Sequence, residues 1–367
     1  MPFIAAASKI EFPFKADQQE VKRQVKEMFE ANFPQVERLI YAFDNTEIIT
    51  RNFCKPLSWY KEPNTFEERN NSYIETSLEY SVQAIEDCIA KAGITNEDLT
   101  DIYFVTTTGL ATPSLDALII NRMRLPQNIN RTPVWGLGCG GGVSGMAKAC
   151  GAALANPKAA VLLVAVELCS LTLIRADYSK SNFIGSSLFS DGIAACIIKG
   201  DSFIAKEASV KNLTEGSEPA KKQSIKFLAN RSKLYYDSLD VMGWDFRDDG
   251  FKVLFSKDIP TFINQNIRGD IDAFLSENNL QLGQIQNFIF HPGGKKVLDA
   301  YKEALAVEGD FLKNTREVMN DHGNMSSCTV LYVLEKFISD GFNDGYGLMV
   351  AMGPGFSSEM VLLKMEN

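Results

Sequence analysis

The chain has 367 residues, 45% of them hydrophobic, with a formal net charge of -9 and a pI near 5.0. A chain of this size can bury a large core in two domains or one double-size unit. Its charge disfavours a general nucleic-acid or anionic-membrane binder and leaves room only for a local basic patch. The longest aliphatic run, Ala159 to Val166, is too short to span a bilayer.

The sequence also bears on the cellular compartment of the protein and on its capacity to bind a metal ion. Seven cysteines are scattered along the chain without a CxxC pair, which argues against a disulfide framework and favours a reducing compartment. The start of the chain lacks the basic segment and long apolar run of a signal peptide, so we expect a cytoplasmic protein. The two histidines, His291 and His322, lie apart from any cysteine cluster. We therefore expect no metal and no cofactor.

Hydrophobic periodicity predicts helices and strands in alternation. A surface helix is expected within 14–33 and a long amphipathic helix over 72–92, which ends at Gly93. Next we expect a strand over 101–107, a helix over 114–124, a strand near Val134, a helix over 146–154, and strands over 159–166 and 193–199. A second series has a strand over 251–255, a helix to about Phe274, a strand over 285–290, helices over 294–305 and 325–338, and strands near Leu348 and Val361. This alternation indicates an α/β fold with a covered sheet.

A polar segment from Asp201 to Gln223, rich in Lys, Glu, Ser and Asn, is the clearest change in composition. We place a boundary there. The N-terminal half, 1–215, carries a candidate nucleophile, and the C-terminal half is 216–367. No sequence repeat is visible, but the similar order of strands and helices in the two halves is typical of an internally duplicated α/β fold.

The candidate nucleophile is Cys139, which lies between an apolar run and a helix of small residues. Unpaired N–H groups at a helix start favour a thiolate, so we expect a lowered pKa for this thiol. The surrounding segment 136–141, GLGCGG, also satisfies GxGxxG. However, no Asp or Glu occurs between Cys139 and Val166 to hold a ribose. The segment therefore favours a thiol site over a dinucleotide loop.

Two residues of the C-terminal half could serve this thiol. His291 ends an apolar strand and precedes Pro292-Gly293-Gly294, at the sheet edge where open α/β folds bind ligands. Asn324 follows a His-Gly pair and could equally cap a helix, just as a lone histidine is more often structural than catalytic. Taken together, Cys139, His291 and Asn324 supply an attacking thiolate, a proton partner and a donor to an oxyanion.

Four motifs in this order resemble those of the type III polyketide synthases, the chalcone and stilbene synthase-like enzymes. They are Gly138-Cys139-Gly140-Gly141-Gly142, His291-Pro292-Gly293-Gly294, Gly323-Asn324-Met325-Ser326-Ser327 and Gly353-Pro354-Gly355-Phe356. The resemblance implies a thiolase-like fold, a duplicated αβαβα five-layered core, and usually a homodimer. It makes Cys139 the carrier of a starter from acyl-CoA. His291 and Asn324 would hold the thioester or enolate oxygen while malonyl-CoA is decarboxylated and repeated Claisen condensations extend the chain.

The resemblance also assigns the residues around the triad. Phe189 matches a gatekeeper aromatic, and Val253 falls where the family has a second gatekeeper phenylalanine. The other cavity residues are Thr107, Cys169, Thr172, Gly355 and Phe356. Contacts with coenzyme A are expected from Arg38, Lys295, Lys296 and Ser326.

The segments 166–172, 179–182 and 240–245 look most like the bacterial branch that makes alkylpyrones and alkylresorcinols from long-chain acyl-CoA. Several alternatives stay open. One is a single-condensation enzyme similar to ketoacyl-acyl-carrier-protein synthase III, or a hydroxymethylglutaryl-CoA synthase. Another is a type III synthase that makes tetrahydroxynaphthalene or phloroglucinol-type products from malonyl-CoA. A third, of a different class, is an acyl-CoA-binding protein without turnover.

Overall fold

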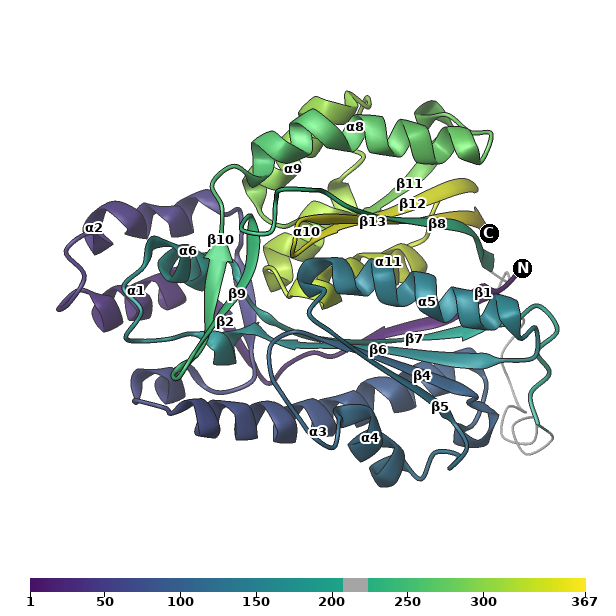
Figure 1. Ribbon diagram of the computed structural model, residues 1–367, viewed down its shortest axis with the longest axis horizontal. Helices are drawn as coiled ribbons and strands as arrows, with labels where there is room; N and C mark the ends of the chain where they lie inside the picture. The colour runs from purple at the N-terminus through teal and green to yellow at the C-terminus, as the bar shows by residue number, and fades with distance from the viewer. Residues whose placement is uncertain (207–223) are drawn as a thin grey trace.

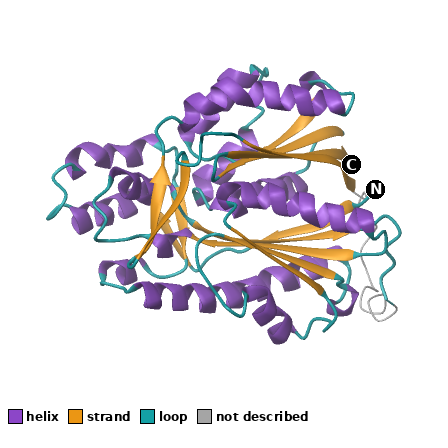
Figure 2. Ribbon diagram, viewed as in Figure 1, coloured by secondary structure: helices purple, strands orange, loops and turns teal. Residues whose placement is uncertain are grey.

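The computed structural model describes residues 1–206 and 224–367, so the predicted boundary between 215 and 216 lies outside the described residues. Two β layers and three helical layers are stacked on one another (Figures 1 and 2). Helices α3 (Phe66–Ala92) and α4 (Leu115–Met123) form one outer layer, and α8 (Ile259–Glu277) and α9 (Lys295–Leu305) form the other. Helices α5 (Gly141–Ala155) and α11 (Thr329–Asp340) lie between the β layers. The order helix, sheet, helix, sheet, helix matches the predicted five-layered core.

The strands are hydrogen-bonded in the order β11-β12-β13-β8-β1-β7-β6-β4-β5. The two β layers meet where β1 and β8 pair through Phe3–Lys226 and Ile4–Ile225. One layer contains β1 (Phe3–Lys9), β4 (Asp101–Thr106), β5 (Asn130–Trp135), β6 (Ala160–Leu168) and β7 (Asp191–Lys199). The other contains β8 (Ser224–Leu234), β11 (Ile285–Phe290), β12 (Gly345–Gly353) and β13 (Ser357–Glu366). Pairing is parallel for β4 with β5 and β6, and for β11 with β12; the other pairs in this sheet are antiparallel.

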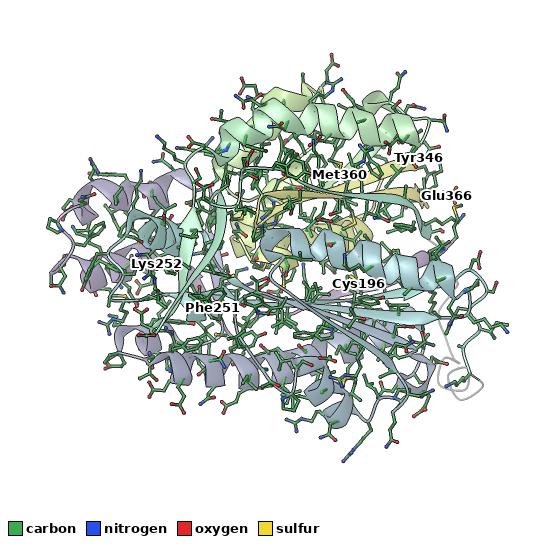
Figure 3. The ribbon with its side chains drawn as sticks, viewed as in Figure 1. Cys196, Phe251, Lys252, Tyr346, Met360 and Glu366 are labelled. Atoms are coloured by element: carbon green, nitrogen blue, oxygen red, sulfur yellow. The ribbon has the colours of Figure 1, made fainter. Side chains whose placement is uncertain are left out.

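The central strands are apolar because helices cover both of their faces. Every residue of β6 is buried, as is nearly all of β7. Figure 3 shows side chains filling the spaces between the layers; Cys196 on β7 and Met360 on β13 are both fully buried. All seven cysteines lie in the described part of the chain, where each is buried and free.

The observed elements differ from the predicted ones mainly at their ends. Helix α3 begins earlier than predicted because Thr65 and Glu68 form a capping box ahead of the apolar pattern. The segment predicted as one surface helix contains β2 (Phe14–Asp17) and α1 (Gln18–Phe29). Strands β1, β8 and β9 (Met242–Arg247) and helices α6 (Lys180–Leu188) and α10 (Lys313–His322) were not predicted; the core of β1 is mostly alanine, which carries little strand signal.

Shorter elements gather at one end of the layers, around α1 and α6. Two strands, β9 (Met242–Arg247) and β10 (Gly250–Phe255), form a separate hairpin there, and β2 pairs with β3 (Thr50–Phe53). The remaining short helices are α2 (Val36–Leu39), η1 (Ile40–Asn45), η2 (Leu57–Lys61), η3 (Asn96–Asp98), η4 (Gly138–Gly140), η5 (Cys169–Thr172), η6 (Leu282–Gln284) and η7 (Ser326–Cys328). In the ranges 1–206 and 224–367, no helix is both long and apolar enough to cross a bilayer.

Candidate active site

Cys139 lies in η4, the single 3-10 turn between β5 and α5. The glycines around it allow close approach of segments from the two halves. A Cβ at Gly138, whose φ is +45°, would lie 2.7 Å from Cδ of Pro354, and a Cβ at Gly142 would lie 2.2 Å from the carbonyl oxygen of Ser327. The glycine-rich segment therefore packs the nucleophile against the C-terminal half.

Asn324 is held by both its backbone and its amide. Its N–H donates to the carbonyl of Leu188 (2.9 Å), and its carbonyl accepts from the N–H of Ser190 (2.8 Å), so it lies beside Phe189 in a parallel bridge. Its Nδ2 donates to the carbonyl of Gly293 (3.1 Å), and its Oδ1 accepts from the N–H of Ser326 (2.9 Å). Because α11 begins at Thr329 with Cys328 as its N-cap, Asn324 does not cap that helix.

His291 continues from β11, where its N–H donates to the carbonyl of Val350 (2.8 Å). The side chain is 3% exposed, and neither ring nitrogen has a hydrogen-bond partner among the described residues. Burial lowers the pKa of His291 to about 3, which makes the imidazole neutral. A buried, unpartnered imidazole two residues from the Gly293 carbonyl that binds Asn324 is poised for a ligand.

Cys139 lines a small cavity, which we call the chamber. The predicted site residues that line it are Thr107, Cys139, Cys169, Phe189, Val253 and Ser326. Thr172 lies in the neighbouring cavity, together with Cys169, Phe189 and Val253. Folding therefore brings most of the predicted cavity residues to the nucleophile.

The charge state of Cys139 differs from our prediction. Burial raises its pKa to about 12, the nearby Glu167 adds to the rise, and hydrogen bonding with Ser326 and Asn324 opposes it only in part. The predicted lowered pKa is wrong for the free protein because the buried chamber disfavours a thiolate more than the helix start favours it. The resting pair is a thiol and a neutral imidazole.

Glu167 was not predicted as a site residue, yet it lies directly behind the chamber. Its Oε1 accepts from Oγ of Ser327 (2.6 Å) and its Oε2 from the N–H of Thr107 (3.1 Å). Burial raises its pKa to about 7. The Thr107 side chain accepts from the N–H of Gly138 (3.0 Å), so this acid and threonine support the turn that carries Cys139.

Phe356 does not line the chamber. Its ring packs against Tyr235 and Phe262, with centroids 6.0 and 4.9 Å apart, in the core beside β13. The predicted cavity role is wrong for Phe356 because the turn before β13 directs its ring into that core. Gly355 serves the turn, with φ of +91°, and Pro354 reaches the chamber wall.

The residues predicted to contact coenzyme A lie in different surroundings. Ser326 is 6% exposed beside the sulfur, so it can meet only the thioester end of the substrate. Lys295 pairs with Glu47 (3.3 Å) and Asp299 (2.9 Å). Arg38 and Lys296 are exposed. Contacts with the phosphates stay a prediction.

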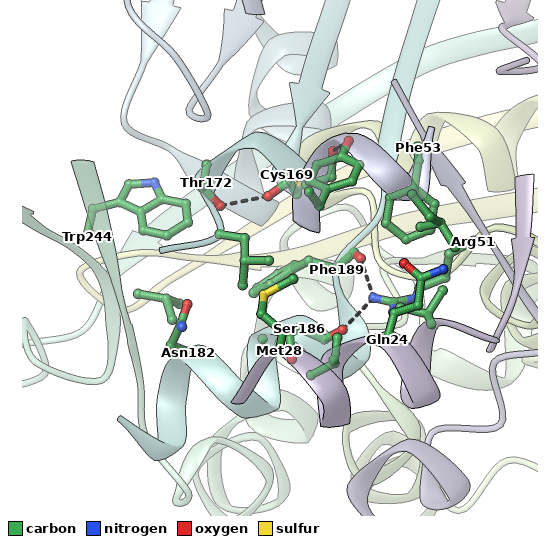
Figure 4. Close-up of a pocket in the computed structure, with 18 residues that line it drawn as sticks. Gln24, Met28, Arg51, Phe53, Cys169, Thr172, Asn182, Ser186, Phe189 and Trp244 are labelled. Atoms are coloured by element: carbon green, nitrogen blue, oxygen red, sulfur yellow. Dashed lines mark hydrogen bonds between the residues drawn. The ribbon is translucent and has the colours of Figure 1, made fainter. Parts of the chain in front are cut away.

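A second cavity adjoins the chamber and is shown in Figure 4; we call it the tail compartment. Cys169, Phe189, Trp244 and Val253 line both cavities and so form the boundary between them. Trp244, which we did not predict, pairs across the hairpin with Val253, and its indole N–H donates to the carbonyl of Thr107 (3.1 Å). The Asp-Gly pair at 249–250 is a hairpin signal from which the cross-strand position of Trp244 could have been predicted.

Arg51 is a further unpredicted residue of the tail compartment. It is 1% exposed, and its Nη1 donates to the carbonyls of Ser186 (2.7 Å) and Phe189 (2.9 Å), as Figure 4 shows. The two bonds hold the end of α6 and the backbone of Phe189. A buried arginine in a short strand carries no motif, so the sequence offers no sign of this role.

Comparisons with known proteins agree with this architecture. The sequence matches the family models for the N-terminal domain (residues 14–202) and the C-terminal domain (residues 229–366) of chalcone and stilbene synthases. It is 39% identical over 360 residues to a putative chalcone synthase of Bacillus subtilis, covering 96% of each chain. It is 33% identical over 317 residues to 1,3,6,8-tetrahydroxynaphthalene synthase of Streptomyces peucetius, covering 86% of this chain and 80% of that protein.

Among solved structures, tetrahydroxynaphthalene synthase from Streptomyces coelicolor superposes with a TM-score of 0.90 at 24% identity, covering 100% of this chain and 99% of the other. A type III polyketide synthase domain from Dictyostelium superposes with a TM-score of 0.86. Both likenesses confirm the predicted thiolase-like α/β fold. With both family models covering most of its length, this chain belongs to the chalcone and stilbene synthases and is a condensing acyltransferase, a type III polyketide synthase.

Proposed function

We propose that the protein makes alkylpyrones or alkylresorcinols from a long-chain acyl-CoA starter and malonyl-CoA. The starter is transferred to Cys139, malonyl-CoA is decarboxylated, and the resulting enolate attacks the acyl thioester. Repeated condensation then lengthens the chain before it cyclises. The observation that carries the proposal is the tail compartment next to the chamber, because an aliphatic tail needs a place away from the growing polyketide.

The walls of the tail compartment suit an aliphatic tail. Several of its polar side chains donate to nearby backbone carbonyls: Thr172 to Cys169 (2.7 Å), Ser186 to Phe183 (2.6 Å) and Asn182 to Ile174 (2.8 Å). Their polar atoms are thereby turned from the cavity, while Val21, Val25, Met28 and Leu57 contribute apolar surface. Burial of each methylene contributes roughly 0.8 kcal/mol to binding, so tail length strongly affects affinity.

The chemistry follows from the neutral resting pair. As the sulfur of Cys139 attacks the starter thioester, its proton passes to the imidazole of His291 and then to the departing thiolate of coenzyme A, so no isolated charge forms on either group beforehand. Loss of carbon dioxide from the malonyl group needs no base. Hydrogen bonds from His291 and Asn324 stabilise the enolate oxygen, each contributing about 3 kcal/mol in a buried site.

A second candidate is the synthesis of tetrahydroxynaphthalene from malonyl-CoA alone. It is supported by the relative from Streptomyces peucetius and by the match with the solved synthase from Streptomyces coelicolor. This reaction needs no long tail, so it leaves the tail compartment without a role. We therefore prefer the long-chain starter.

The test is mass spectrometry of products formed with malonyl-CoA and a series of saturated starters from acetyl-CoA to eicosanoyl-CoA. Cyclised tri- or tetraketides from long starters are expected. Tetrahydroxynaphthalene formed from malonyl-CoA alone would support the second candidate. A single condensation with every starter would contradict both and favour an enzyme similar to ketoacyl-acyl-carrier-protein synthase III.

A homodimer is part of the proposal. Strand β5 lies at one edge of the sheet in the described part of the chain, which leaves its outer N–H and C=O groups available for a second copy. Trp135 on this strand is 41% exposed and the nearby Leu110 is 44% exposed. Light scattering is expected to give a dimeric mass, which Trp135→Glu should reduce. A monomeric wild-type protein would contradict this assembly.

The phosphates of coenzyme A are assigned to Arg38 and Lys296, whose side chains are exposed. Lys295 would first have to release Glu47 and Asp299. Substitution of Arg38 or Lys296 by alanine is expected to raise the KM for malonyl-CoA with little change in kcat. Unchanged KM values in both variants would contradict the assignment.

A further inference from the structure

A third hollow lies beyond the tail compartment, open to the surface. It is a groove lined by residues of η2, of the segment after η5 and of the start of α3, among them Trp59, Ile174 and Tyr178. Four residues line both the groove and the tail compartment: Met28, Tyr60, Ser170 and Leu173. Residues that face two neighbouring hollows separate them, so we call these four the partition.

Resting on the proposed function, we propose that the partition opens and that the groove binds the distal part of the longest acyl tails. The occupant is the tail of the starter whose carbonyl carbon is bonded to Cys139. This follows from the order of the hollows: the chamber adjoins the tail compartment at Cys169, Phe189, Trp244 and Val253, and the tail compartment adjoins the groove at the partition.

The partition is built from parts that can move without disturbing the β layers. Tyr60 belongs to η2, a 3-10 segment of five residues. Leu173 follows η5 in a connection, and Met28 is an unbranched side chain near the end of α1. Short 3-10 segments and flexible methionines adapt more readily than strands buried on both faces.

One hydrogen-bond network closes the partition. The Tyr60 hydroxyl lies 2.6 Å from Oγ of Ser170, which donates to Oδ2 of Asp191 (2.6 Å). Asp191 is fully buried at the start of β7 and also accepts from the backbone N–H groups of Cys54 (2.7 Å) and Ser170 (2.8 Å). The network therefore joins a movable tyrosine to a fixed strand. The net strength of one such hydrogen bond is comparable to burying about one or two methylene groups, so a longer tail can displace it.

The groove offers a surface that an alkyl chain can cover. The rings of Trp59 and Tyr60 pack edge to face with centroids 5.0 Å apart, and Tyr178, at 39% exposed, packs on Phe29 and Phe33. At the rim, Arg175 donates to the carbonyl of Lys61 and joins the two walls. The groove is thus lined by aromatic rings and by charged side chains, whose apolar stems can also contact an alkyl chain.

Two variants test the partition in opposite directions, with kcat/KM measured for octanoyl-CoA and for eicosanoyl-CoA. Tyr60→Phe removes the hydroxyl and keeps the ring, so the preference for the longer starter is expected to rise about threefold to tenfold. Leu173→Trp fills the partition, so kcat/KM for eicosanoyl-CoA is expected to fall at least about tenfold more than kcat/KM for octanoyl-CoA. Tyr80→Phe is the matched control, because Tyr80 is partly buried against Phe12 and lines none of the three hollows.

A binding measurement separates this inference from the proposed function. Eicosanoyl-CoA with a terminal diazirine is photolysed on the wild-type protein and the crosslinked peptides are sequenced. Crosslinks at Trp59, Ile174 or Tyr178 are expected. Crosslinks confined to Val21, Val25 or Phe53, with product formed and both variants keeping the wild-type preference, would overturn the inference while the proposed function stands. If no starter longer than butanoyl-CoA gives product or crosslinks, the proposed function itself fails.

Discussion

The chamber around Cys139 and the tail compartment beside it are built from different kinds of structure. The chamber lies where strand ends and helix starts of both halves meet, and backbone hydrogen bonds join Asn324 to the segment of Phe189. The tail compartment is enclosed mostly by α1, η2, η5 and α6, which lie outside the β layers. Strand ends and helix starts of the layers therefore fix the surroundings of Cys139, while the short segments that enclose the tail compartment can vary without changing the layers.

The largest expected effect is the loss of chain extension when Cys139 in the chamber is replaced. Cys139→Ala removes the atom that carries the starter, so chain extension should fall by at least about a thousandfold. Malonyl-CoA decarboxylation should persist, because the enolate is stabilised by other residues. Product analysis and carbon dioxide release measure the two activities separately. Full extension by this variant would remove Cys139 from its role.

Asn324→Ala should reduce decarboxylation and extension together by about 10²- to 10³-fold, because both steps pass through the same enolate. Asn324→Asp keeps the size of the side chain and replaces its N–H donor by an oxygen, so it should be equally impaired. Carbon dioxide release is the direct measurement. An alanine variant with wild-type decarboxylation would show that Asn324 only positions Ser326 and the segment of Phe189.

The raised pKa of Glu167 predicts that the free energy of unfolding depends on pH. In the folded protein its pKa is raised to about 7 from the ordinary glutamate value of 4.5, so the folded state retains a proton that the unfolded chain loses. The contribution of Glu167 to the free energy of unfolding is most favourable below about pH 4.5. It falls by about 3 kcal/mol as pH rises to about 7 and is constant above that. Denaturant unfolding across this pH range should show that the free energies of unfolding of the wild type and Glu167→Gln differ less at low pH. A difference that does not change with pH would contradict the raised pKa of Glu167.

Alkylation kinetics test the resting state of Cys139. With a pKa of about 12, the thiolate fraction rises with pH, so the rate of iodoacetamide labelling should increase roughly tenfold per unit between about pH 7 and pH 10. Peptide mapping restricts the measurement to Cys139. A rate that levels off near neutral pH would instead indicate a stable thiolate–imidazolium pair with His291.

The smallest expected effects are those of replacing one of two tryptophans, only one of which lines the cavities. Trp244 and Trp135 each donate an indole N–H to a backbone carbonyl, of Thr107 and Gly109 respectively, at 3.1 Å. Replacing either by phenylalanine should lower the free energy of unfolding by about 1 kcal/mol. Only Trp244→Phe should alter the preferred starter length, because Trp135 lines neither the chamber nor the tail compartment. Equal starter profiles in the two variants would contradict a boundary role for Trp244.

The difference between the two cavities also explains what could be predicted from the sequence. Cys139, His291 and Asn324 stand in turns whose glycines and proline are required by close packing, and such turns are visible as motifs. Met28 and Tyr60 act through the shape of a cavity assembled from distant segments, which no local pattern encodes. The pKa of Cys139 was predicted in the wrong direction because burial depends on the whole chamber, whereas the helix start is local. Phe356 was assigned to the wrong place because a motif identifies a turn without giving the direction of its side chains.

The backbone bridge between Phe189 and Asn324 has a consequence for how such an enzyme changes. The ladder that aligns the amide of Asn324 uses only main-chain atoms of residues 188–190, and Arg51 also contacts only carbonyls there. The side chain at position 189 can therefore be exchanged while the amide keeps its register. Selection for a new starter can then proceed through single substitutions at the boundary between the chamber and the tail compartment. Each such variant keeps the position of the Asn324 amide and can be substituted again.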